Sequence, residues 1–199
     1  MRKHSQNRKI NPLDVSYKPD GTVLDNDRVE IGPTDLSFKD WEVAGLPPPI
    51  LSKMREYRVK RLVNQINLRN LDGVLVFDPL NIRYITDSTN MQLWNSHNPF
   101  RACFISSSGY IILWDYKGLN ILSSFNSLVS ECRHSASMFY FSNGDKIEDD
   151  AKSFASEVKS ILNLHCEKGK RLAVDKIQIH GLRALEKLGI KIFDGEEVM

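Results

Sequence analysis

The sequence has few cysteines and no long apolar run, and each shortage excludes a class of protein. Its three cysteines, Cys103, Cys132 and Cys166, stand far apart, whereas a disulfide framework or a zinc knuckle needs paired, closely spaced cysteines. We therefore expect reduced structural thiols in a cytoplasmic protein. No stretch approaches the roughly 20 apolar residues that cross a bilayer. The basic residues 1–10 precede no apolar segment, so neither a membrane span nor a secretory signal is expected.

An excess of one charge is also missing. The 27 lysines and arginines nearly balance the 25 acidic residues, which leaves a formal net charge of +2. Domains that bind nucleic acid usually show a basic stripe interleaved with aromatic residues. Here the basic residues are scattered and often stand beside acids, as on ordinary solvated helix faces. No nucleic-acid partner is predicted.

Catalytic and metal-binding motifs are absent as well. The histidines are His4, His97, His134, His165 and His180. None belongs to a His-x-x-x-His or His-x-x-Glu arrangement, and the chain has no phosphate loop, dinucleotide fingerprint or nucleophile elbow. His165 and Cys166 are adjacent, but neighbouring residues on a helix point about 100° apart. We therefore expect no catalytic residue and no metal ligand in this chain.

Two regions differ in composition. Residues 1–48 are polar, rich in prolines and turns, and nearly free of periodicity, because proline restricts its neighbours and removes a backbone donor. They are predicted to form an irregular arm that lies over the domain or over a partner subunit, with a partly disordered leader as the alternative. Residues 49–199 are predicted to form one domain, since 41% of the chain is apolar and can build a core.

Periodicity predicts a mixed α/β fold for residues 49–199. The expected elements are a helix over 50–70, a buried strand over 74–77, a hairpin of strands 102–106 and 110–115, a short strand over 138–141, a helix over 146–167, and a strand, helix and strand over 172–175, 177–188 and 190–193. The first strand is a continuous apolar run, which is typical of a strand covered on both faces. The last strand–helix–strand unit predicts a right-handed parallel pair.

One segment points to a known family. Residues 77–87 read FDPLNIRYITD and resemble the strand–loop signature of the N-terminal domains of creatinase, prolidase and aminopeptidase P. The predicted order of elements also matches. The resemblance implies a creatinase N-terminal-like, ribonuclease H-like mixed sheet with helices on both faces. In those families a C-terminal "pita-bread" domain carries every metal ligand, and residues 194–199 stand where it would begin, so the chain is expected to be a fragment without that domain.

Residues 87–101 narrow the resemblance. They read DSTNMQLWNSHNPFR and are similar to the DddP-type dimethylsulfoniopropionate lyases, as are residues 26–34, 172–177 and 180–186. The resemblance implies a metal-dependent homodimer that cleaves dimethylsulfoniopropionate, a small sulfonium acid, to dimethyl sulfide and acrylate. The metal, iron in at least some members, belongs to the C-terminal domain. This chain alone is therefore expected to bind no cofactor and to be inactive.

Two residues are the candidate substrate-binding groups. A sulfonium makes no useful hydrogen bond, so an aromatic face is its natural receptor, and in the resembled family a tryptophan at the position of Trp94 reaches the active site across the dimer. The alternative is that Trp94 anchors a core or an interface. His97 would orient a substrate carboxylate or cap its loop. Arg101 is expected to pair with a nearby acid such as Asp87, and Trp114 to lie in the core.

Two other functions remain open. The chain would equally suit the N-terminal domain of an Xaa-Pro dipeptidase or aminopeptidase P, which shares the architecture and differs in its pocket. It would also suit a free-standing binding or dimerisation module. Residues 87–101 favour the lyase, because the peptidases share little of this stretch.

Overall fold

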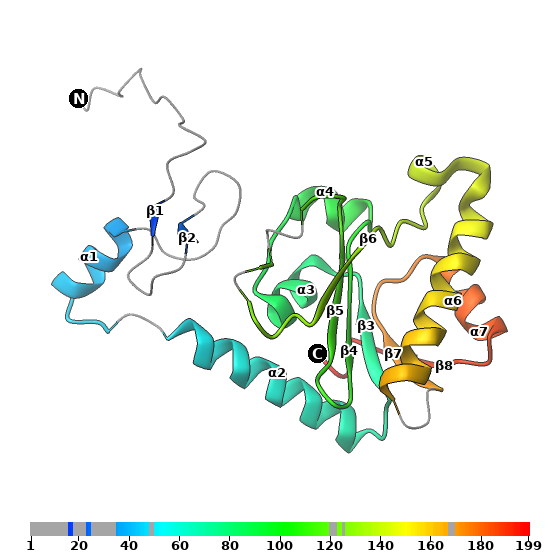
Figure 1. Ribbon diagram of the computed structural model, residues 1–199, viewed down its shortest axis with the longest axis horizontal. Helices are drawn as coiled ribbons and strands as arrows, with labels where there is room; N and C mark the ends of the chain where they lie inside the picture. Colours follow the sequence, from blue (N-terminus) through cyan, green and yellow to red (C-terminus); the bar gives the residue numbers. More distant parts are fainter. Residues whose placement is uncertain are drawn as a thin grey trace.

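A computed structural model of the chain describes residues 16–17, 23–24, 35–47, 50–119, 123–124, 126–166 and 170–199. Two short antiparallel strands, β1 (Ser16–Tyr17) and β2 (Val23–Leu24), come first. They are followed by α1 (Asp35–Val43) (Figure 1). This helix lies where the sequence predicts little regular structure. Phe38 and Trp41 are one turn apart and their rings meet edge to face at 5.7 Å, which is a contact that favours a helical turn.

A six-stranded mixed sheet forms the centre of the fold. Its order is β6-β5-β4-β3-β7-β8, and only β4 runs against its neighbours. The strands are β3 (Gly73–Val76), β4 (Ala102–Ser106), β5 (Ile111–Asp115), β6 (Glu131–His134), β7 (Arg171–Val174) and β8 (Lys191–Asp194). Every residue of β3, β4 and β5 is buried, so these strands have apolar side chains on both faces.

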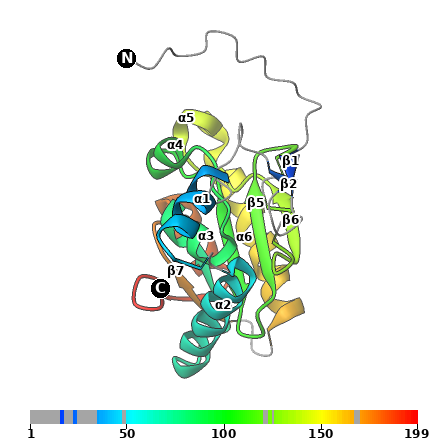
Figure 2. The ribbon, with the colours of Figure 1, turned by 90° about the vertical axis from the view of Figure 1, so that its left-hand side faces the viewer.

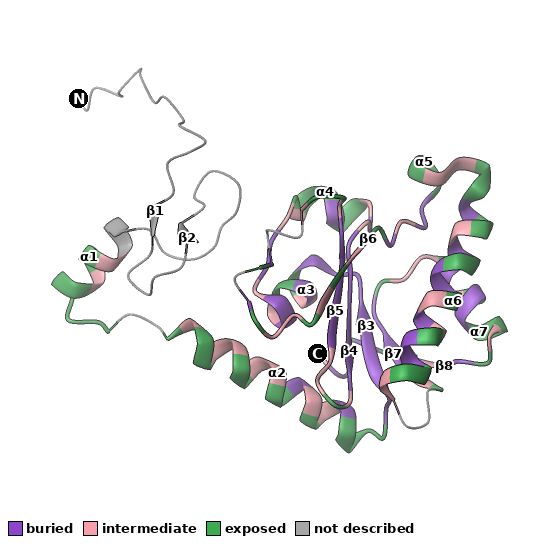
Figure 3. Cartoon of the chain, in the orientation of Figure 1, coloured by how far each residue is buried: buried purple, intermediate pink, exposed green. Residues whose placement is uncertain are grey.

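Helices cover both faces of this sheet. α2 (Leu51–Leu68) and α3 (Pro79–Thr86) pack on one side, and α6 (Ile147–His165) and α7 (Ile179–Lys187) pack on the other. Figure 3 shows strands β3, β4, β5 and β7 largely in purple between these helices, whose outward sides are green, whereas the edge strands β6 and β8 are half-buried or exposed. The expected mixed α/β fold with helices on both faces is confirmed. No helix of the described residues is long and apolar enough to cross a membrane.

The predicted elements are confirmed with one exception. The helices over 50–70, 146–167 and 177–188, the hairpin, and the strands at 74–77, 172–175 and 190–193 are all present, and Trp114 is fully buried. The strand expected over 138–141 is wrong. The sixth strand is β6, whose residues alternate between half-buried and exposed and therefore give no apolar run at the edge of the sheet. Residues 140–143 instead form the short helix α5 (Tyr140–Asn143).

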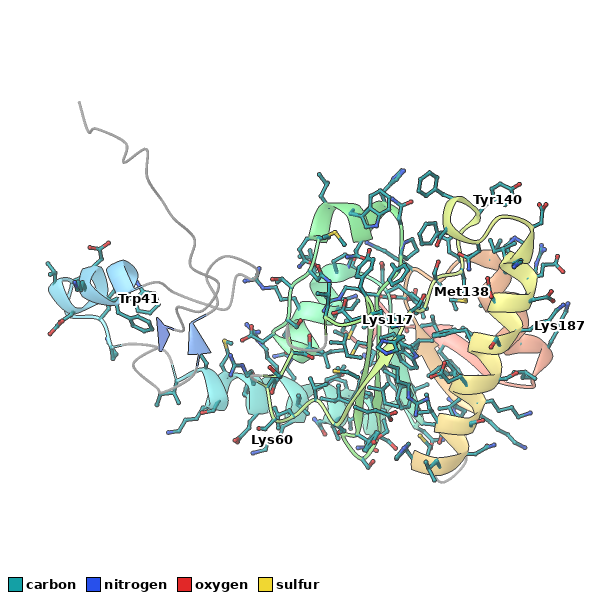
Figure 4. The ribbon with its side chains drawn as sticks, turned by 45° about the horizontal axis from the view of Figure 1, so that its top comes forward. Trp41, Lys60, Lys117, Met138, Tyr140 and Lys187 are labelled. Carbon is teal, nitrogen blue, oxygen red and sulfur yellow. The ribbon has the colours of Figure 1, made fainter. Side chains whose placement is uncertain are left out.

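Met138 explains the misleading strand pattern. Residues 138–141 read Met-Phe-Tyr-Phe, a short apolar and aromatic run that is typical of a buried strand, but Met138 and Phe139 are buried whereas Tyr140 and Phe141 are exposed. Met138 anchors the segment on α7, where a Cβ on Gly181 would lie 2.7 Å from its sulfur. Figure 4 shows Met138 inside the molecule and Tyr140 at its rim.

Gly73 is a point at which the sheet tolerates no side chain. A Cβ there would lie 2.6 Å from the Phe104 ring and 2.7 Å from the carbonyl oxygen of Ile105, so Gly73→Ala must displace backbone. We expect the variant to lose about 1–3 kcal/mol of unfolding free energy, as overpacked cores do, in urea denaturation. Ser156→Ala on the exposed side of α6 is the control. Equal stability of the two variants would contradict the close packing of β3 on β4.

Candidate functional site

The carboxyl ends of several strands meet at one edge of the sheet. β3, β5 and β7 run in the same direction and end there, and β4, which is antiparallel, begins there. Polar residues follow or precede these strand ends: Asp78 after β3, Arg101 before β4, Asp115 at the end of β5 and Asp175 after β7. They form two separate hydrogen-bonded clusters, each of which fixes a segment of the edge.

The first cluster fixes the start of α3. The Asp175 carboxylate accepts hydrogen bonds from the backbone N–H groups of Phe77 at 2.6 Å and Asp78 at 3.1 Å, and from the Asn81 amide at 3.0 Å. Asp78 in turn caps the helix by accepting from the N–H of Leu80 at 2.7 Å, as residues at this position commonly do. The segment 77–87, expected from the resemblance to be a loop after the strand, is therefore largely helical.

The pKa values of the two carboxyl groups in this cluster are shifted in opposite directions. Burial raises the pKa of Asp175, against the lowering effect of its hydrogen bonds. Burial also acts to raise the pKa of Asp78, but hydrogen bonds from Lys176 and from the backbone outweigh it and leave the pKa below its ordinary value. Asp78 therefore adds stability that is lost as the pH falls through its lowered pKa, whereas Asp175 favours folding less as the pH rises through its raised pKa.

The second cluster surrounds a buried ion pair. Arg101 is only 1% exposed, and its Nε and Nη2 lie 3.0 and 2.9 Å from Oδ2 of Asp115. Nη2 also donates to Ser88 Oγ at 3.0 Å. The other oxygen of Asp115 accepts from Asn90 at 2.9 Å. The expectation that Arg101 pairs with an acid is confirmed, but the acid is Asp115 and not the example Asp87, which lies 2.9 Å from Arg55 of α2.

This ion pair holds a short helix, α4 (Gln92–His97), within the segment expected to be a loop. Asn95 is buried and donates to the carbonyl oxygens of Asn90 at 2.6 Å and Met91 at 3.1 Å. The Tyr116 hydroxyl, one residue after Asp115, donates to Asn95 Oδ1 at 3.4 Å. The chain enters α4 through Met91, whose φ is +41°, a left-handed conformation that a non-glycine residue adopts only when its surroundings fix it.

Trp94 lies on α4 and is 42% exposed. Its ring meets the Phe141 ring of α5 at 6.1 Å between centroids and 71° between planes. Beneath it, Tyr116 stacks on Phe100 at 4.0 Å. Burial raises the pKa of Tyr116, and a hydrogen bond from the Trp94 indole to its hydroxyl opposes that rise. The structure therefore places Trp94 outside the hydrophobic core, with one side held and the other in solvent.

His97 lies in the last turn of α4, one turn after Trp94, and is exposed. The two predicted site residues are thus brought onto the same short helix. Sequence reasoning missed Tyr116 and Phe141 as neighbours of Trp94, and Phe100 as the ring that stacks on Tyr116. The partner of Arg101 could have been predicted from the register of the hairpin. The hairpin pairs Ala102 with Trp114, so residues 101 and 115 stand opposite each other one step further along.

The described residues contain no cluster of potential metal ligands. Within them, no group of three or more His, Cys, Asp or Glu side chains converges so as to hold a metal ion. Asp78 and Asp175 are near one another, but their carboxylate oxygens already accept hydrogen bonds from Lys176, Asn81 and backbone N–H groups. This part of the chain therefore does not fit a metal, and the edge of the sheet serves to position α3 and α4.

Comparisons with known proteins agree on the family of this fold. The sequence model of the creatinase/prolidase N-terminal domain matches residues 58–198. Two relatives are named dimethylsulfoniopropionate lyase DddP. The one from Roseovarius nubinhibens is 52% identical over 98% of this chain and 44% of its own length. The one from Roseobacter denitrificans is 51% identical over 100% of this chain and 44% of its own length. The chain thus spans less than half the length of either relative.

A solved structure shares the fold. The Xaa-Pro aminopeptidase structure from Streptococcus pyogenes superposes with a TM-score of 0.50, covering 74% of this chain and 99% of that chain at 14% sequence identity. At this level of identity the likeness concerns the fold alone. It supports the same mixed sheet and the same helical layers described above.

Removing one partner of the buried ion pair should be strongly destabilising. We expect Arg101→Met to lose about 3–5 kcal/mol of unfolding free energy, because it leaves the Asp115 charge buried without its partner. The double variant Arg101→Met/Asp115→Leu should recover part of that loss in urea denaturation. Lys152→Met, which removes an exposed cation paired with Asp149, is the matched control and should have little effect. A double variant less stable than Arg101→Met would contradict the coupling.

Asp175 should shape the pH dependence of stability. Because its pKa is raised in the folded protein, the folded state holds this proton more tightly than the unfolded state. Unfolding free energy contributed by Asp175 should therefore decline as the pH rises above about 4. Asp175→Asn should lose this component, so its stability falls less between pH 4 and 7 than that of the wild type. Asp149→Asn, on the surface, is the control, and identical pH slopes for wild type and Asp175→Asn would refute the assignment.

Proposed function

This chain belongs to the creatinase/prolidase N-terminal domain family, and from that membership we propose that it is the non-catalytic part of a metal-dependent lyase. The lyase would cleave dimethylsulfoniopropionate to dimethyl sulfide and acrylate, and this domain would complete the substrate pocket and dimerise. The similarity to the two named lyases along almost the whole chain supports this proposal. The observation that carries it is the position of Trp94, held from below and half-exposed above.

The reaction itself needs groups that the described residues do not bring together. In the elimination a base removes the proton α to the carboxylate, the electron pair forms the double bond between the α and β carbons, and the bond from the β carbon to sulfur breaks. Dimethyl sulfide then leaves as a neutral molecule. The base and the metal, iron in some lyases, would belong to a catalytic domain that provides several converging ligands.

Trp94 would bind the sulfonium end of the substrate. A sulfonium carries a permanent charge and makes no useful hydrogen bond, so it gains most from an aromatic face, where cation–π attraction is worth roughly 0.5–2 kcal/mol. The Arg101–Asp115 pair and Asn95 hold α4 in one position, so the indole is pre-organised and little ordering is lost on binding. His97, one turn further on the same helix, would orient the substrate carboxylate.

The surface around Trp94 would dock onto a second subunit. Several large apolar side chains near it are exposed: Met91 by 51%, Leu93 by 88% and Tyr140 by 67%. Contiguous exposed apolar side chains commonly mark an interaction surface. A homodimer in which α4 of one subunit closes the pocket of the other would cover them and would bring Trp94 to the substrate.

A chimera tests this function. This chain would replace the matched segment of the Roseovarius nubinhibens lyase, and dimethyl sulfide would be measured in the gas phase for the chimera and for this chain alone. We expect activity in the chimera and none in the short chain. Hydrolysis of Xaa-Pro dipeptides without dimethyl sulfide release would instead identify a peptidase domain, and activity of the short chain would disprove a non-catalytic role.

Trp94→Ala in the active chimera addresses the substrate pocket. We expect KM to rise about tenfold, since tenfold corresponds to about 1.4 kcal/mol and lies within the range of one cation–π contact, while Trp94→Phe retains part of the affinity. Trp41→Ala on α1 is the matched tryptophan control. If Trp94→Ala left both KM and kcat unchanged, the indole would have no place in the substrate pocket. His97→Ala, measured in parallel, should raise KM without altering the metal content.

A further inference from the structure

The ring of Phe141 extends the aromatic surface offered by Trp94. Phe141 is 80% exposed, and its plane lies at 71° to that of the indole, with 6.1 Å between the centroids. Two rings that meet nearly at right angles present two adjacent faces to one ligand. They come from helices far apart in the sequence, α4 and α5, which lie near each other at the same end of the molecule in Figures 1 and 2.

α5 is fixed relative to α4 rather than loosely attached. The N–H of Ala136 donates to the carbonyl oxygen of Phe100 at 3.1 Å, which joins the segment before α5 to the segment after α4. Met138 is buried beneath α5. At the other end, the Asn143 amide donates to the carbonyl oxygen of Ser137 at 3.1 Å and to the Asp150 carboxylate at 2.7 Å. The two helices that carry the rings are therefore held by separate anchors.

The cations of the described residues leave these two ring faces uncovered. Arg58 lies over the Tyr84 ring at 5.5 Å, and Arg171 lies over the Phe193 ring at 4.2 Å. No such contact is made to Trp94 or Phe141 by a lysine or arginine of the described residues. The sequences of α4 and α5 also contain no lysine, arginine, aspartate or glutamate. A ligand cation would meet no competing positive charge from these helices.

We propose that Phe141 supplies the second aromatic face of a receptor for a sulfonium or quaternary ammonium group, next to the first face on Trp94. This inference rests on the proposed function, which identifies a sulfonium acid as the substrate, and it adds α5 to the pocket as a specificity-determining element. A methylated cation has no hydrogen bonds to give, so its affinity grows with the number of ring faces that it contacts.

Two isosteric inhibitors separate charge recognition from simple packing. 3-(Trimethylammonio)propanoate carries the cation, and 4,4-dimethylpentanoate has the same shape without it. In the lyase chimera, Phe141→Leu keeps an apolar side chain but removes the ring. We expect it to raise KM for dimethylsulfoniopropionate and Ki for the ammonium-bearing inhibitor about 3- to 10-fold, with kcat and Ki for its carbon isostere nearly unchanged. Phe141→Tyr should restore the wild-type values.

Tyr57→Leu is the matched control, because Tyr57 is 61% exposed on α2 and its hydroxyl accepts a contact from Arg61 at 3.5 Å. The inference is overturned if Phe141→Leu weakens both inhibitors equally, weakens neither, or acts no differently from Tyr57→Leu. Equal weakening together with a weaker dimer in sedimentation would make Phe141 an interface contact. Calorimetric binding of the two inhibitors needs no turnover, so a chimera that releases no dimethyl sulfide but prefers the cation through Phe141 refutes only the proposed function.

Discussion

The Arg101–Asp115 ion pair is the contact on which the functional end of this domain depends. A buried charge is tolerated only when a partner and further hydrogen bonds satisfy it. Here one carboxylate gathers Arg101, Asn90 and a backbone N–H, and the arginine also holds Ser88. These bonds fix both ends of the segment that carries α4. The ion pair thus holds the segment that carries α4 in one conformation.

The mixed topology of the sheet makes this arrangement available. Because β4 alone runs against its neighbours, the residue before it stands at the same edge as the residues that end β3, β5 and β7. Asp175 uses this edge to fix the start of α3, through bonds to Phe77 and Asn81. Asp115 uses it to fix α4. Buried carboxylates whose acceptors are filled by arginine, amides and backbone N–H groups act as structural supports for the helices above them.

The exposed rings at this edge are set apart from the core. Trp114 is completely buried, whereas Trp94 and Phe141 are exposed on two short helices without lysine, arginine, aspartate or glutamate. The core consists of the central strands and the inner sides of four helices. In the proposed function, the exposed aromatic faces would bind the methylated cation and contact the partner subunit.

Local patterns in the sequence suffice to predict the layers of the fold, namely the periods of α2, α6 and α7 and the continuous apolar runs of β3 to β5. The register of the hairpin likewise places residues 101 and 115 opposite each other. The packing of the elements, by contrast, brings Asp87 to Arg55, makes Met138 an anchor under a helix rather than part of a strand, and sets Phe141 beside Trp94. These contacts join segments widely separated in sequence, and they depend on how the elements pack rather than on any period within one of them.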